Sequence, residues 1–86
     1  MPTENELKAL ILHKLRRGRC WGGKYRPIQK VIRYIPPHLR GKAKDLIDEM
    51  IKEGFLESHK RKKCVSLNIR YKEEIIRFIR KYRIYI

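Results

Sequence analysis

Basic side chains gather in two short segments of this chain, and they are its most chemically informative residues. Ammonium and guanidinium groups in such clusters bind phosphate oxygens through charge and hydrogen bonds. The predicted chemistry is therefore the neutralisation of a polyanion rather than the making or breaking of bonds. The first segment contains His38, Arg40, Lys42 and Lys44, and the second contains Lys60, Arg61, Lys62 and Lys63.

The charge of the whole chain is segregated along the sequence. The net charge is +14 over 86 residues. Residues 7–44 hold twelve Lys and Arg and no acid, residues 45–57 hold five acids and one Lys, and residues 58–72 hold six bases and no acid. A surface that is charged only for solubility usually mixes the two signs. The segregation therefore favours a polyanionic partner such as DNA, RNA or an anionic membrane surface.

Catalytic and metal-binding motifs are not visible in the sequence. It contains no phosphate loop, no Ser-His-Asp framework and no carboxylate pair at an apolar site, so we expect neither an enzyme nor a cofactor. The Cys and His residues show no zinc-like spacing. A signal peptide and an apolar run of membrane-spanning length are also missing, which predicts a cytoplasmic protein. The potential metal ligands are Cys20, Cys64, His13, His38 and His59.

A capping box formed by Thr3 and Glu6 predicts a first helix, which ends at Gly18. Residues 19–27 form a loop whose Trp21 and Tyr25 either cover the core or present their rings to a base or sugar. A short second helix is predicted from Pro27, as its first residue, to about Tyr34. The first helix has an apolar stripe of Leu7, Leu10, Ile11 and Leu15, and the second buries Ile28, Val31, Ile32 and Ile35.

The third helix, from about Pro37 to Glu53, has the clearest periodicity in the chain. Bases at its start and acids at its end both oppose the helix dipole, which makes sense if its N-terminal end faces phosphate. Gly41 permits either close helix packing or close approach of a sugar-phosphate strand. The apolar side is Leu39, Ala43, Leu46, Ile47, Met50 and Ile51, and the opposite side is Arg40, Gly41, Lys44 and Asp48.

A two-stranded hairpin is predicted after Gly54, which ends the third helix. Its strands are residues 55–59 and 64–68, with Val65 and Leu67 pointing inward, and its basic tip has no Gly or Asn to define the turn type.

Asn68 is the predicted N-cap of a last helix. The apolar surface of that helix either packs within the chain or pairs with a second copy, which gives a homodimer. Residues 83–86 alternate in polarity and would suit a short strand.

The order α-α-α-β-β-α is typical of a winged helix-turn-helix domain. We therefore predict one α+β domain, mainly α, over residues 1–86, with its core in residues 4–68 and a C-terminal helix over about 69–83. Residues 7–75 also resemble a group of small archaeal winged-helix proteins. The resemblance lies in Trp21-Gly22-Gly23-Lys24, in the HLRG segment that begins at His38, and in Val65-Ser66-Leu67-Asn68.

This chain departs from that group at two places. It has Ile69 where the group tends to have proline, and Lys60 to Lys63 where the group tends to have a glycine-containing wing. The resemblance implies a winged-helix fold and nucleic-acid binding, without naming a target.

The leading hypothesis is a duplex-DNA-binding protein, either a transcriptional regulator or a chromatin-associated factor. In the usual winged-helix dock, the third helix enters the major groove and the hairpin lies along the neighbouring backbone. Arg40 and Lys44 would then face the groove, with His38 and Lys42 near phosphate. The wing contacts would be the residues of the hairpin tip, Lys60, Arg61, Lys62 and Lys63. The flanking backbone would be held by Lys24, Arg26, Lys30 and Arg33.

Two other functions remain open at this point. A structured RNA would find stacking partners for unpaired bases in Trp21, Tyr25 and Tyr34. A protein-interaction module would instead use the acidic strip over residues 45–57 and the apolar last helix.

Overall fold

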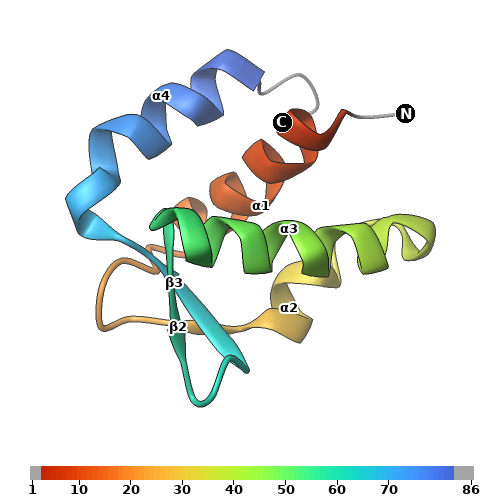
Figure 1. The fold of residues 1–86 in the computed structure, drawn as a ribbon, viewed down its shortest axis with the longest axis horizontal. Helices are drawn as coiled ribbons and strands as arrows, with labels where there is room; N and C mark the ends of the chain where they lie inside the picture. Colours follow the sequence, from red (N-terminus) through yellow and green to blue (C-terminus); the bar gives the residue numbers. More distant parts are fainter. Residues whose placement is uncertain (1–2, 83–86) are drawn as a thin grey trace.

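Helices and a small antiparallel sheet make up residues 3–82, the part of the chain that the computed structural model describes (Figure 1). The structure is α+β and mainly helical, as predicted. Two of the helices, η1 and η2, are single 3-10 turns. In chain order the elements are α1 (Glu4–Arg17), β1 (Arg26–Pro27), α2 (Ile28–Ile32), η1 (Pro37–Leu39), α3 (Arg40–Glu53), β2 (Leu56–His59), β3 (Cys64–Leu67), η2 (Ile69–Tyr71) and α4 (Lys72–Tyr82).

The predicted caps of the first and third helices are confirmed. Thr3 Oγ1 accepts a hydrogen bond from the Glu6 amide at 3.1 Å, while the Thr3 amide donates to Glu6 Oε1 at 2.8 Å. This reciprocal pair satisfies two amide groups that the first turn of a helix leaves without partners. At the other boundary, Gly54 adopts a left-handed φ of 95°, and its amide bonds back to Met50 and Ile51 at the end of α3.

The sheet has three strands, in the order β1-β3-β2, where the sequence predicted only a hairpin. β3 pairs antiparallel with β2 from Leu56↔Leu67 to His59↔Cys64, and with β1 through Arg26↔Val65. β1 is only two residues long and contains a proline, so it leaves no alternating pattern in the sequence. Pro27 accordingly precedes α2 rather than beginning it, and α2 ends at Ile32 rather than near Tyr34.

Every residue of the central strand β3 is buried, although alternation predicted that only Val65 and Leu67 would point inward. The loop after α1 explains the difference, because it runs beside β3 and covers its second face. Trp21 forms an isolated bridge with Leu67, and the Gly22 amide donates to Leu67 O at 3.0 Å. Trp21 is half-buried and packs against the core, as the core-covering interpretation predicted.

One hydrophobic cluster joins all four α-helices to the sheet. α1 and α3 each supply four of its buried residues, and α4 packs beside α1 (Figure 1). The predicted apolar faces of the first three helices are confirmed. The largest fully buried side chains are Ile11, Leu12, Leu15, Val31, Ile35, Leu46, Ile47, Met50, Leu56, Leu67, Ile75 and Ile79.

The last helix begins one turn later than its predicted cap. Asn68 Oδ1 accepts from the Arg70 amide at 3.1 Å and therefore caps η2, which leads into α4. Ile75 and Ile79 of α4 are fully buried, so much of its apolar side is used within the chain. Pairing with a second copy stays a prediction. The strand suggested for residues 83–86 lies outside the described residues.

Gly41 lies in the first turn of α3, where a Cβ would meet no atom within 4 Å. Close helix packing therefore does not explain this glycine. We expect Gly41→Ala to raise the free energy of unfolding by about 0.5–1 kcal/mol, because alanine restricts the unfolded chain and favours the helix. Urea titration followed by circular dichroism measures this change.

Gly54→Ala is the matched control for that substitution. It places a Cβ at a left-handed φ and 3.0 Å from a Tyr71 ring carbon, so the same titration should show destabilisation. A loss of stability in Gly41→Ala would contradict the assignment of open space around Gly41.

Candidate nucleic-acid interface

An open groove of about 650 Å³ brings α3 and the hairpin tip together. Lys44 enters it from the second turn of α3, and three lysines enter it from the tip. In Figure 1, α2 lies below α3 and to the right of the hairpin. The residues that line the groove are Pro27, Ile28, Gln29, Lys44, Asp48, Lys60, Lys62, Lys63 and Cys64.

The backbone holds the hairpin tip against α2. The Ile28 amide, at the start of α2, donates to Lys63 O at 2.9 Å. Lys60 O accepts from the Lys63 amide at 3.2 Å, which closes a tight turn. This pairing fixes the lysines of the tip relative to Lys44, so the groove does not depend on a freely moving loop.

The tip has an unusual backbone for its residue types. Lys60, Arg61 and Lys62 have φ values of 53°, 56° and 69°, all in the left-handed region. Positive φ at both central residues is typical of a type I′ turn, where Asn-Gly is strongly preferred. Each long side chain in this region costs roughly 1–2 kcal/mol. Strain of this kind is often found where a side chain has a function.

Arg40 does not line the groove. Its Nε donates to Ile35 O at 3.0 Å, and a terminal guanidinium nitrogen donates to Arg33 O at 3.3 Å. These bonds close the turn between α2 and α3 and leave Arg40 half-buried. Of the two residues predicted to face the DNA groove, only Lys44 lines the groove between α3 and the hairpin tip.

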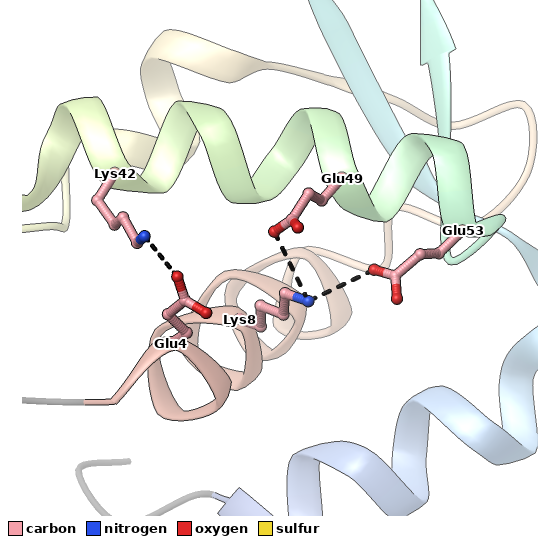
Figure 2. A network of polar contacts seen from close by, with 5 residues as sticks. All are labelled: Glu4, Lys8, Lys42, Glu49 and Glu53. Carbon is pink, nitrogen blue, oxygen red and sulfur yellow. Dashed lines mark hydrogen bonds and ion pairs between the residues drawn. The ribbon is translucent and has the colours of Figure 1, made fainter.

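Lys42 points toward α1 and forms an ion pair with Glu4 (Figure 2). This contact lowers the pKa of the Glu4 carboxyl and raises the pKa of the Lys42 ammonium. Because the Glu4 pKa is lowered on folding, the pair stabilises the fold above the ordinary carboxyl pKa. That stability is lost as the pH falls through the lowered value. Both groups are exposed, so the effect is small.

The acids near the end of α3 have a structural partner. Lys8 Nζ lies 3.4 Å from Glu53 Oε1 and 3.9 Å from Glu49 Oε2, so α1 and α3 are joined by charge along one side (Figure 2). Sequence reasoning attributed these acids to a helix that points its start at phosphate. The structure instead shows them facing α1, which leaves Asp48 as the acid that lines the groove.

Three of the other predicted contacts lie on the other side of α2. Arg26, Lys30 and Arg33 line a hollow of about 300 Å³ beside Tyr34. Lys24, His38 and Arg61 are exposed and line neither this hollow nor the groove.

Two polar and aromatic contacts involve His59, the last residue of β2 before the hairpin tip. The Tyr25 and His59 rings are stacked, with centroids 4.6 Å apart and an interplanar angle of 19°. His59 Nε2 lies 2.9 Å from Ser66 Oγ, which donates to Gly22 O at 2.7 Å. The hydroxyl has one proton, and Gly22 O accepts it, so His59 Nε2–H must be the donor in the other bond. Sequence reasoning did not find this network, because its members are far apart in the chain.

Residues 3–82 contain no group of three or more Cys, His, Asp or Glu that could hold a metal ion. Cys20 and Cys64 are free and buried. No helix in the same residues is both long and apolar enough to cross a membrane.

Comparison of the chain with protein-family models, with curated proteins and with solved structures found no match.

Proposed function

We propose that this chain is a winged-helix protein that binds nucleic acid, with duplex DNA as the favoured target. The observation that carries the proposal is the groove in which Lys44 of α3 meets Lys60, Lys62 and Lys63 of the hairpin tip. A helix and a hairpin that present cations to one space match the way a winged helix contacts a duplex. A transcriptional regulator or a chromatin-associated factor would use such an interface.

The groove also has an internal polarity. Asp48 lies four residues after Lys44 on α3 and lines the same groove. A carboxylate repels phosphate, but it accepts a hydrogen bond from the amino group of cytosine. Phosphate would therefore lie toward Lys44 and the hairpin tip, and a base edge would lie toward Asp48.

The proposal is tested by titrating labelled duplex DNA with the Lys44→Ala variant at several salt concentrations. If Lys44 contacts one phosphate, affinity should fall several-fold, and the slope of log K against log salt should become about 0.9 units shallower. Fluorescence anisotropy measures both quantities.

Lys42→Ala is the matched control, because it removes the same charge from the same helix on the side that faces Glu4. It should leave duplex affinity nearly unchanged. Equal losses in both variants would show that net charge, rather than the groove, governs binding. A flat salt response in the unmodified protein would favour the protein-interaction module.

Structured RNA is the second candidate function, and one observation favours it. Tyr34 is 59% exposed beside several cations, and an exposed aromatic ring is suited to stacking with an unpaired base. An RNA stem-loop in the same titration decides between the two. Tighter binding of the stem-loop than of the duplex would replace the DNA proposal.

A further inference from the structure

We infer that the surface around Tyr34 binds a single-stranded nucleic-acid segment that adjoins the bound duplex. We call this surface the Tyr34 site. The inference rests on the proposed function for the duplex half of the ligand, and the Tyr34 site supplies the second half. The preferred substrate would then be a junction between duplex and single strand. The site consists of Lys14, Arg17, Gly18, Arg26, Lys30, Arg33 and Tyr34.

Two adjoining hollows give the Tyr34 site its shape. One has a volume of about 360 Å³ and lies between the end of α1 and β1. The other has a volume of about 300 Å³ and lies along α2. Arg26 and Tyr34 line both hollows and thus form a shared wall. This geometry suits a flexible chain that places successive units on either side of a ring.

Tyr34 contributes little to the hydrophobic core. The residue is 59% exposed, and the Lys14 ammonium lies 4.8 Å from the centroid of its ring. A cation at that distance is attracted to the ring and helps to orient it. Trp21 packs against the core and Tyr25 stacks on His59. Of the three aromatic residues that the sequence suggested for base stacking, Tyr34 is the most exposed, and cations line both hollows beside it.

The charge of the Tyr34 site has one sign. Its five cations come from α1, β1, α2 and the turn that follows, and no acid lines either hollow. None of the five forms an ion pair with an acid in residues 3–82. The groove, by contrast, includes Asp48. Because the Tyr34 site has cations and no acid, it is more favourable than the groove for a closely bound phosphate backbone.

Arg26 is the best-positioned cation of the Tyr34 site. Its backbone is held by pairing with Val65 in β3, and its side chain is half-buried. A Cβ added to Gly18 would lie only 2.7 Å from a guanidinium nitrogen of Arg26, so Gly18 leaves the space in which that group lies. A half-buried side chain has fewer conformations to lose when its guanidinium binds phosphate.

The Tyr34 site is close enough to the groove for one nucleic-acid molecule to occupy both. α2 has five residues and is therefore about 7.5 Å long. Ile28 and Gln29 of this helix line the groove, while Lys30 lines the Tyr34 site. A strand that leaves a duplex in the groove needs only to pass one turn of α2 to reach Tyr34.

The chemistry of recognition follows from these residue types. A base stacks on the Tyr34 ring, and the adjoining phosphates lie against Arg26 and its neighbours. Stacking of this kind tolerates any base, because each has an aromatic face, so the site should show little sequence preference.

The test compares a blunt duplex with the same duplex carrying a single-stranded tail of about five nucleotides, a length within the range that such sites cover. The full chain should bind the tailed duplex about tenfold more tightly than the blunt one, given the usual contribution of one stacked base. Tyr34→Ala should remove this preference and leave blunt-duplex affinity unchanged. Tyr34→Phe should keep the preference. Arg77→Ala, which removes an exposed cation from α4, is the charge control and should also keep it.

The outcomes separate this inference from the proposed function. Equal affinity of the unmodified protein for blunt and tailed duplexes overturns the Tyr34 site, even if Lys44→Ala weakens both. If the unmodified protein does not bind the blunt duplex but binds the isolated single-stranded tail, the proposed duplex-binding function is overturned. Single-strand binding by the Tyr34 site then stands without it. An iodouracil base in the tail should also photo-cross-link to Tyr34, and exclusive cross-linking elsewhere would contradict the assignment. DNA and RNA tails, compared directly, identify which strand the site accepts.

Discussion

A double substitution at the hairpin tip, Arg61→Asn with Lys62→Gly, should stabilise the fold and weaken duplex binding at the same time. Both residues have left-handed φ values, which Asn and Gly adopt at much lower cost. We expect the free energy of unfolding to rise by about 1–2 kcal/mol as this backbone strain is relieved. Urea titration at a fixed, moderate salt concentration measures the gain.

The binding side of this prediction follows from charge. If both cations contact phosphate, their loss should make the slope of log K against log salt about 1.8 units shallower. Few substitutions change stability and affinity in opposite directions with such a clear structural reason. The pair of measurements therefore tests whether the strain at the tip is retained in order to present cations.

Arg61→Gln with Lys62→Gln is the matched control, because it removes the same charges and keeps side chains that disfavour a left-handed backbone. It should weaken binding as much as the Asn-Gly variant does, without the same gain in stability. If the two variants are equally stabilised, the gain comes from reduced charge repulsion in a chain of net charge +14, and the turn is not strained.

The elements with strong local signals were predictable from the sequence. The Thr3–Glu6 capping box and the left-handed Gly54 are local patterns with a single physical meaning, and both are confirmed. β1 was missed because two residues cannot show periodicity, and it exists only through pairing with β3. The burial of Ser66 was also missed, because the loop that covers it is distant in the sequence.

The candidate site was less predictable from the sequence than the helix ends were. Helical spacing predicted that Arg40 and Lys44 would face the DNA groove, with Lys42 near phosphate. In the structure the three side chains have different surroundings. Arg40 donates to carbonyls before η1, Lys42 pairs with Glu4, and Lys44 lines the groove. A cation near an unpaired backbone carbonyl or a carboxylate on another helix is satisfied there. Only the assembled fold shows which cation has no such partner.

The second large effect concerns stability and lies in the network behind the hairpin. Ser66→Ala should lower the free energy of unfolding by about 1–3 kcal/mol, the usual cost of leaving a buried polar group without its partner. Ser66 is fully buried, and its hydroxyl joins Gly22 O to His59 Nε2. Without it, the loop that covers β3 loses its side-chain bond to that strand. In a domain of this size the melting temperature should fall by roughly 4–24 °C.

His59→Phe is the matched variant, because it keeps a ring that stacks on Tyr25 and removes only the bond to Ser66. Ser66 can still donate to Gly22 O, so the loss of stability should be smaller than in Ser66→Ala. The double variant should be less destabilised than the sum of the two single variants, since the second change finds its partner already gone. Strict additivity would show that His59 and Ser66 act independently. The hydroxyl bond to the Gly22 carbonyl would then be the contact that fixes the loop over the sheet.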